Sequence, residues 1–445
     1  MSMPTDYLAR LRSLGYRNRQ IAKGGAATLA YRGTSVLVNL VTVPLLYEAL
    51  GRERFGVVMA LLAVGVAVSF GDLGVGNGLQ NYLASVQDDR ARAAEVVKTG
   101  LAYASGVALA IVVIAVPTVS RLDLRGLFGT DILGQDHLAG LTTLLIGLLA
   151  VQIPLSLGQR VLAAYQRLHV HGLIMASASV VSLCGVLLVV HARPSLGAVL
   201  LALLLPQVLA NGAALAYAMR ALDLRIGKAQ VDWSRRLVDE LLLTGLVFFA
   251  VQAAFIAHAT TDSLFVSSSL GAGELTDYSL VMRVVAVLVL PISALAAPLL
   301  GGLNDALARG DREWVRQGLR RVAAAALANV LLVTTVFTFA IEPVLGLWIG
   351  RAFAFGTPLL LSFAAVLAFQ GVSIPLSTCA MTTPLLRPAA LAYCGAVAVG
   401  IGAKAYALST AGLASFNLAS ATALAILYVT PTAWLTYRRL YAPNS

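Results

Sequence analysis

The stretch Lys98–Ser120, KTGLAYASGVALAIVVIAVPTVS, carries a single charged residue, at its start. A helix that crosses the hydrocarbon core of a bilayer needs about 20 consecutive and mostly apolar residues. The stretch meets this requirement. It is continuously apolar, unlike a membrane-barrel strand, in which apolar and polar residues alternate over about ten positions. The stretch therefore predicts a transmembrane α-helix.

Stretches of the same kind recur along the whole chain. Hydrophobic residues make up 59% of the 445 residues and charged residues only 12%, whereas soluble domains carry about 25% charged residues. A chain this apolar cannot cover several soluble domains with polar surface, so we expect an all-α polytopic membrane protein of about twelve spans. The predicted spans are 25–50, 56–85, 98–120, 138–160, 172–191, 196–220, 241–265, 278–304, 318–340, 358–380, 388–408 and 413–437.

The basic residues predict an orientation in the membrane. With twelve spans both termini lie on one side, and 23 of the 32 Lys and Arg residues fall in segments on that side. Only 6 fall on the opposite side, and the other 3, namely Arg32, Arg283 and Lys404, lie within spans. Cytoplasmic loops carry an excess of Lys and Arg, so we expect both termini in the cytoplasm and the protein in the inner membrane. Contact with the anionic inner leaflet explains the net charge of +11, and no nucleic-acid partner is expected.

Two similar halves follow one another in the sequence. Leu50-Gly51 and Leu270-Gly271 each open a segment with a long span and a polar stretch that leads to a basic loop. Six spans per half imply a pseudo-two-fold axis along the membrane normal, as in many transporters; a chance similarity is the alternative. The expected parts are a basic amphipathic N-terminus (1–24), a six-helix bundle (25–220), a basic cytoplasmic linker (221–239), a second six-helix bundle (240–437) and a cytoplasmic tail (438–445).

Polar residues inside the spans are the candidate functional residues, because placing them in lipid is costly. Arg32 and Asn39 are seven residues apart and share a helical face. Four glycines from Gly71 to Gly78 weaken the helix around Asp72 by about 1 kcal/mol each relative to Ala, so a kink facing an interior cavity is expected. The candidate substrate-binding residues are Arg32, Asn39, Asp72, Asn77, Gln80, Asn81, Gln252 and Arg283, and the candidates for ion coupling are His258 and Asp262.

Each candidate also has a structural interpretation. Arg32 and Arg283 can extend to the lipid headgroups instead of the interior. Asp72 can pair with an Arg of a neighbouring helix or cap a broken helix, and His258 can be a packed, hydrogen-bonded histidine. Lys404 lies close to the end of its span, and we expect it to extend to the outer interface. If the two arginines do face the interior, they suit an anionic substrate, because a guanidinium binds phosphate oxygens in a fork and stays charged when buried.

The sequence holds no motif for a cofactor, a metal or catalysis. Cys184, Cys379 and Cys394 are odd in number and lie in apolar spans, so they predict neither a disulfide framework nor a metal site. The glycines of Gly74–Gly78 follow no strand, which argues against a dinucleotide loop, and no Walker loop is present. We therefore expect no cofactor, no metal and no enzyme activity. Transport energy would come from an ion gradient, the membrane potential or consumption of the product.

Two segments carry a resemblance to a known family. Leu50-Gly51-Arg52-Glu53-Arg54-Phe55-Gly56 resembles the first outer loop of Wzx-type polysaccharide flippases, members of the multidrug/oligosaccharidyl-lipid/polysaccharide exporter superfamily. Asp72-Leu73-Gly74-Val75-Gly76 resembles the signature at the end of their second span. The resemblance is clearest over residues 25–100, and Asp277-Tyr278 departs from the family's usual Gly-Tyr pair. It implies two bundles around a central cavity that spans one, two, seven and eight line.

The resemblance also implies a function. An undecaprenyl-pyrophosphate-linked oligosaccharide would be flipped from the inner to the outer leaflet for cell-surface polysaccharide, such as O-antigen or exopolysaccharide, by alternating access of the two halves. Its expected partners are this substrate and membrane lipids. The sequence does not decide whether the polysaccharide polymerase machinery is also a partner. The protein is expected to be a monomer. An ion-coupled multidrug exporter of the same superfamily is the main alternative. A membrane glycosyltransferase or ligase is a weaker alternative, because such enzymes carry a large outer loop and this sequence has none. A receptor or scaffold explains neither the half-repeat nor the broken span.

Overall fold

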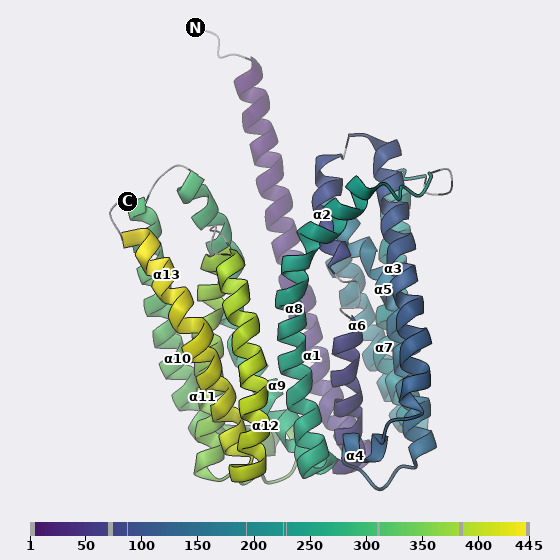
Figure 1. Ribbon diagram of the computed structural model, residues 1–445, viewed down its shortest axis with the longest axis vertical. Helices are drawn as coiled ribbons and strands as arrows, with labels where there is room; N and C mark the ends of the chain where they lie inside the picture. Colours follow the sequence, from purple (N-terminus) through teal and green to yellow (C-terminus); the bar gives the residue numbers. More distant parts are fainter. Residues whose placement is uncertain are drawn as a thin grey trace. The chain divides into compact units, whose positions relative to one another are not determined.

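The computed structural model describes the backbone of residues 5–69, 74–86, 88–192, 194–225, 227, 229–308, 312–381 and 386–441. Side chains are described from residue 31 onward, with gaps that include Arg32, 67–73, 238–248 and 291–316. No β-strand occurs in these ranges, and the predicted all-α class is confirmed. The elements are α1 (Thr5–Ser69), α2 (Val75–Ser85), α3 (Arg90–Val119), α4 (Leu124–Phe128), α5 (Gln135–Ala164), α6 (Leu168–Ala192), α7 (Leu196–Ala221), α8 (Arg235–Leu270), α9 (Ala272–Ala308), α10 (Arg312–Ile349), α11 (Thr357–Met381), α12 (Leu386–Leu424), a π-helical turn η1 (Ala425–Val429) and α13 (Thr430–Tyr441) (Figure 1).

Each of the twelve predicted spans overlaps helix in the structure, and the span 56–85 is divided between α1 and α2. Within the described residues, nine helical stretches are long and apolar enough to cross a membrane. Two of them, Gly33–Val66 and Pro388–Arg438, each contain parts of two predicted spans. The predicted span 278–304 lies in α9. The predicted interruption near the glycine-rich motif is confirmed, because α1 ends at Ser69 and α2 begins at Val75 after Gly74.

Two glycines with a left-handed backbone lie at corresponding positions of the two predicted halves, each at the end of a helix. Gly51 has φ 76° and interrupts α1, while Gly271 has φ 96° and separates α8 from α9. Residues with a Cβ rarely adopt this left-handed backbone, and glycine does so at no steric cost. The shared conformation, about 220 residues apart in the chain, supports the predicted correspondence of the halves.

The chain forms two compact units. Unit 1 contains Met1–Gly51, Val64–Arg125 and Asp131–Phe249, and unit 2 contains Arg52–Ala63, Gly126–Thr130 and Ala250–Ser445. Two short segments, 52–63 and 126–130, therefore pack with the second half of the chain although they come from the first half. The predicted boundaries between the two bundles and the linker stay a prediction.

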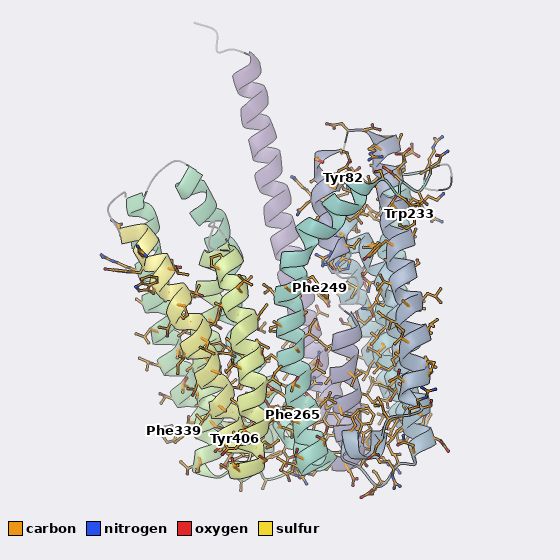
Figure 2. The ribbon with its side chains drawn as sticks, viewed as in Figure 1. Tyr82, Trp233, Phe249, Phe265, Phe339 and Tyr406 are labelled. Atoms are coloured by element: carbon orange, nitrogen blue, oxygen red, sulfur yellow. The ribbon has the colours of Figure 1, made fainter. Side chains whose placement is uncertain are left out.

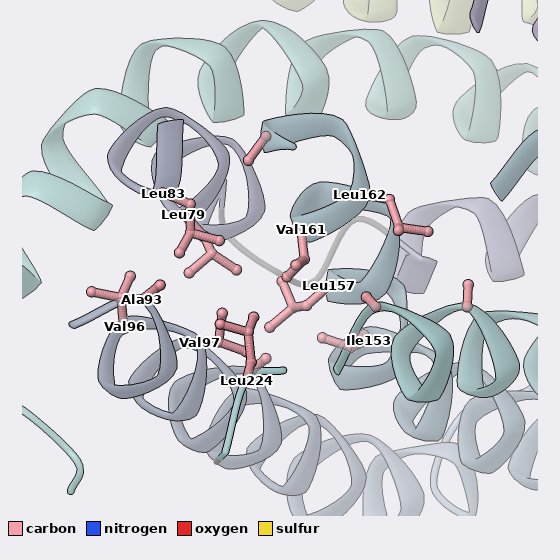
Figure 3. Packing of buried hydrophobic residues seen from close by; sticks show 14 of the residues in the cluster. Leu79, Leu83, Ala93, Val96, Val97, Ile153, Leu157, Val161, Leu162 and Leu224 are labelled. Carbon is pink, nitrogen blue, oxygen red and sulfur yellow. The ribbon is translucent and has the colours of Figure 1, made fainter. Parts of the chain in front are cut away.

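An apolar core holds unit 1 together. Leu79 of α2, Val97 of α3 and Leu157 of α5 are fully buried and point toward one another (Figure 3). Gly100 of α3 lets these helices approach, because a Cβ there would lie 3.2 Å from Leu79 and 3.8 Å from Leu157. The linker closes the same core with Leu224 and Leu237. This packing fixes α2, which carries three of the predicted site residues, against α5.

Large apolar side chains cover the outside of the helices. The side chains of Phe339 and Tyr406 are 80% and 73% exposed (Figure 2), and that of Leu347 is 89% exposed. Leu188 of α6, at 73%, shows the same in unit 1. Soluble proteins rarely expose extended apolar surface, so these faces are the ones that contact lipid.

The linker between the halves is fastened to unit 1 by polar contacts. Lys98 Nζ donates to the carbonyl of Ala229 at 2.7 Å, and the backbone N–H of Asp232 donates to Thr99 Oγ1 at 2.9 Å. The Asp232 carboxylate pairs with Arg92 at 2.7 Å and accepts the N–H of Ser234 at 2.8 Å. The Ser234 N–H, followed by the Arg92 guanidinium, lowers the pKa of Asp232.

We expect Asp232→Asn to lower the free energy of unfolding by about 1 kcal/mol at neutral pH. Because the folded-state pKa lies below the unfolded value of about 3.9, the ionised carboxylate stabilises the fold above that value. This contribution disappears as pH falls through the lowered pKa. Thermal unfolding of both proteins in detergent across acidic pH measures the effect. A difference that persisted at the lowest pH would contradict it.

Candidate functional site

A cluster of charged groups lies inside unit 2, between α8, α9 and α12. Lys404 of α12 is fully buried, and its Nζ pairs with the Asp262 carboxylate of α8 and lies 2.8 Å from His258 Nδ1. The hydroxyl of Tyr278 donates to Asp262 at 3.4 Å, and Lys404 Nζ lies 5.5 Å from the ring centre of Phe416. These five side chains are called the Lys404 cluster. The prediction that Lys404 extends to the outer interface is wrong.

The correction has a physical reason in the length of α12. The predicted span ended at residue 408, but the helix continues to Gly412, where φ is 78°. Lys404 therefore lies about two turns from the break, and a carboxylate on the neighbouring helix receives its ammonium group. A buried charge needs such a partner, because removing an ion from water without one costs several kcal/mol. The cluster brings together an ammonium, a carboxylate and an imidazole, which are groups that can exchange a proton over hydrogen-bond distances.

A second polar contact lies inside unit 1. Arg160 of α5 donates from Nη1 to the side-chain oxygen of Asn77 on α2 at 2.8 Å. Arg160 is the last residue of the predicted span 138–160, and in the structure it lies within α5, four residues before the helix ends. His171 of α6 and Asn211 of α7 are also buried in unit 1, and the Asn211 amide donates to the carbonyl of Gln207 at 2.9 Å. The bond from Arg160 to Asn77 joins α5 to α2.

An ion network closes one end of unit 2. Arg52 Nη2 pairs with Glu274 at 2.7 Å and with Asp277 at 2.9 Å, and Arg351 pairs with the other Asp277 oxygen. The hydroxyl of Thr276 also donates to the carbonyl of Arg52 at 2.6 Å. Asp277, at which the sequence departs from the Gly-Tyr pattern, is thus the shared carboxylate of two arginines. The network ties segment 52–63 to the start of α9.

Backbone contacts hold segment 126–130 in the same place. The N–H of Ala272 donates to the carbonyl of Gly129 at 2.9 Å, and Ser267 donates to the carbonyl of Leu127 at 2.9 Å. Thr130 donates to Glu53 at 2.8 Å, which joins the two short segments to each other. Both segments therefore meet unit 2 at the turn between α8 and α9.

The other predicted site residues lie on α1, α2, α8 and α9. Asn39 is exposed and donates to the carbonyl of Ser35 one turn earlier, at 2.8 Å. Gln80 and Gln252 are partly buried, and Asn81 is exposed. Arg283 is partly buried, with Nη2 3.2 Å from Met59 Sδ of segment 52–63.

Two predicted residues fall outside the described part of the molecule. Asp72 lies in the undescribed residues 70–73, and Arg32 lies in α1 with a side chain that is not described. Of the predicted residues, the structure brings His258 together with Asp262, and it joins Asn77 to a partner that was not predicted.

Sequence reasoning missed Arg160, Lys404 and Tyr278 as members of polar clusters. Lys404 lies near the end of its predicted span, where an interface position is the usual outcome. The predicted span ended four residues before the break at Gly412, and that error moved Lys404 from the interior to the interface. Tyr278 gave no signal beyond its place in a span. Among the described residues no group of three or more His, Cys, Asp and Glu side chains is placed to hold a metal ion.

Comparison with solved structures shows the fold. An inward-facing multidrug resistance MATE family transporter of the MOP superfamily is similar, with a TM-score of 0.76 and 15% identity over 93% of this chain and 98% of that chain. An outward-facing multidrug resistance MATE family transporter gives a TM-score of 0.66 at 16% identity over 96% of both chains. A MOP superfamily transporter from Pyrococcus furiosus, described as having a binding pocket of reverse polarity, gives 0.67 at 15% over 96% of both. The chain thus shares the twelve-helix, two-lobe fold of these proteins.

Comparison of sequences gives the family. Curated protein sequences yield no match. The model of the family described as polysaccharide biosynthesis protein matches residues 21–300, which is more than half of the chain. The apolar helices and the shared fold indicate a multi-pass membrane protein. The chain belongs to the polysaccharide biosynthesis protein family.

Proposed function

We propose that the protein flips a lipid-linked oligosaccharide from the inner to the outer leaflet of the cytoplasmic membrane. The observation that carries the proposal is the match of residues 21–300 to the polysaccharide biosynthesis family, on a fold shared with exporters. Polysaccharide precursors are assembled on a lipid carrier, so a transporter in this pathway must move a large polar head group while the tail stays in lipid. Alternating access, in which the two bundles of residues 25–220 and 240–437 rock about the substrate, performs this step.

In this proposal the polar side chains of the spans bind the head group. Arg32 and Arg283 neutralise its phosphates, because a guanidinium stays charged in the membrane interior. The carboxylate and amides of Asp72, Asn39, Asn77, Gln80, Asn81 and Gln252 contact the sugars. Undecaprenyl pyrophosphate is the expected carrier, and membrane lipids are the remaining partners. The protein acts as a monomer with both termini in the cytoplasm.

The Lys404 cluster is the proposed coupling site. His258 and Asp262 lie within hydrogen-bond distance of the same ammonium group, so a proton gained or lost by either changes the charge of the whole cluster. A change of charge in a buried site alters which conformation of the helices is favoured. Movement of one proton through the cluster would thereby drive one transport cycle.

Arg32→Ala and Arg283→Ala test the proposed phosphate contacts. In cells that depend on this protein for glycan export, we expect each variant to reduce surface polysaccharide at least tenfold, because truncating a buried charge contact to an anion costs more than 1.4 kcal/mol. Surface glycan is measured by gel or lectin blot against the amount of protein in the membrane fraction.

Arg54→Ala is the control, because Arg54 is exposed and forms no ion pair among the described residues. Full export by both arginine variants at normal protein levels would contradict the phosphate contacts. Resistance to cationic dyes without any glycan phenotype would instead favour a multidrug exporter, and sugar transfer by the purified protein would favour an enzyme.

A further inference from the structure

We infer that the Lys404 ammonium group is a tethered cation, which fills the site in unit 2 that a free monovalent cation such as sodium would occupy. The inference deepens the proposed coupling site, and it rests on the proposed function only where it assigns a coupling ion. Two consequences follow from it. Export does not depend on sodium, and removal of the ammonium group converts the Lys404 cluster into a binding site for a small monovalent cation.

Groups that attract cations surround the fully buried Nζ atom of Lys404. This atom pairs with the carboxylate of Asp262 and lies 2.8 Å from Nδ1 of His258. It also lies 5.5 Å from the ring centre of Phe416, which follows the break at Gly412. That distance is within the range of about 6 Å at which the face of an aromatic ring attracts a cation. A carboxylate and an aromatic face attract a small metal ion as well as an ammonium group.

The ammonium group already occupies the ligand atoms that a second cation would need. One Asp262 oxygen receives Lys404, and the other accepts the hydroxyl of Tyr278 at 3.4 Å. An ammonium group has donors and no acceptor, so His258 Nδ1 is the acceptor in its contact with Lys404. A sodium ion beside Lys404 would find these atoms occupied. It would also be repelled by a like charge, and this repulsion is strong in a buried site.

A proton can still enter the Lys404 cluster, because it binds to a lone pair of an existing side chain and needs no separate site. His258 Nδ1 and the Asp262 carboxylate hold such lone pairs, and both face the ammonium group. A proton on either of them competes with Lys404 for the same position. The geometry therefore favours a proton as the coupling ion, in line with the use of acidic and histidine side chains as proton relays in membrane transporters.

Thermal unfolding of the purified full-length protein in detergent tests the inference. The probes are sodium chloride and methylammonium chloride. They are compared with N-methylglucamine chloride at the same ionic strength, because the bulky N-methylglucamine cation cannot enter the site. We expect the wild type to unfold at the same temperature in all three salts. The variant Lys404→Ala empties the site, and we expect sodium and methylammonium each to raise its unfolding temperature by about 2 °C or more.

Two further variants are the matched controls. Lys404→Ala combined with Asp262→Asn also removes the carboxylate, so we expect the gain from both cations to be lost. Lys98→Ala removes a lysine whose described partner is a backbone carbonyl, at 2.7 Å, and it is expected to respond to the salts like the wild type. A Lys404→Ala variant that responds to neither cation would overturn the inference, and so would a wild type that responds as strongly as this variant.

Export by the wild type supplies a second measurement, which decides if Lys404→Ala fails to fold. In cells that depend on the protein for glycan export, we expect equal amounts of surface polysaccharide in sodium medium and in medium with potassium in place of sodium. A loss of export without sodium would overturn the inference and leave the proposed function standing. Cells that lack the protein and keep their surface polysaccharide would overturn the proposed function, and the unfolding measurements would still decide whether Lys404 fills a cation site.

Discussion

Lys404→Met is expected to lower the free energy of unfolding by about 3–5 kcal/mol and to abolish transport. Lys404 is fully buried, and Asp262 is only 14% exposed at its side chain. The substitution keeps a flexible apolar chain of similar length but removes the ammonium group. The Asp262 carboxylate then stays in the interior without its cation, and breaking a buried ion pair in this way costs that amount.

A double variant separates the unpaired charge from the lost packing. Lys404→Met combined with Asp262→Asn removes both charges, so we expect it to recover most of the stability, since replacing a whole buried ion pair by neutral groups is often close to neutral. The measurement is thermal unfolding in detergent, followed by glycan export in cells. Lys98→Met is the matched control. Within the described part of the chain its ammonium donates only to the Ala229 carbonyl, at 2.7 Å, and its loss should cost about 1 kcal/mol.

The two readouts distinguish a structural cluster from a coupling cluster. If Lys404, His258 and Asp262 couple a proton, the stabilised double variant stays inactive in export. If they only hold α8 against α12, the double variant exports glycan normally, and the coupling hypothesis is wrong. A single variant Lys404→Met as stable as the wild type would contradict the buried ion pair itself.

The sequence predicted the spans because a span is a local property. Twenty apolar residues in a row need no knowledge of the rest of the chain. The clusters could not be predicted in this way. Lys404 and Asp262 are 142 residues apart, and Asn77 and Arg160 are 83 apart.

Charged residues at span ends show where local reasoning fails. An ammonium or guanidinium one turn from a helix end reaches water easily, but two turns in it needs a partner. An error of about four residues in the helix end, which is the usual uncertainty of such predictions, decides between these outcomes. For Lys404, about two turns from the break at Gly412, the outcome depended on Asp262, which only the packing of the helices identifies.

Gly129→Ala is expected to displace segment 126–130 from unit 2 and to lower the free energy of unfolding by about 2–5 kcal/mol. Gly129 has φ +60°, and a Cβ there would overlap the carbonyl group of Ser267 and the Cα of Gly271. The left-handed backbone of a residue with a Cβ costs about 1–3 kcal/mol, and overpacking a tight contact costs about as much again. Because the obstacle is backbone, no side chain can rotate away to relieve it.

The damage should spread to the turn between α8 and α9. The Gly129 carbonyl accepts the N–H of Ala272 at 2.9 Å, so a shift of residue 129 breaks the bond that joins segment 126–130 to the start of α9. Gly134→Ala is the control, because a Cβ at Gly134 meets nothing within 4 Å and its φ of −67° suits alanine. Thermal unfolding of the three proteins in detergent measures both effects. An unchanged unfolding temperature for Gly129→Ala would show that segment 126–130 does not support unit 2, and would assign that role to the Arg52 and Asp277 ion pair alone.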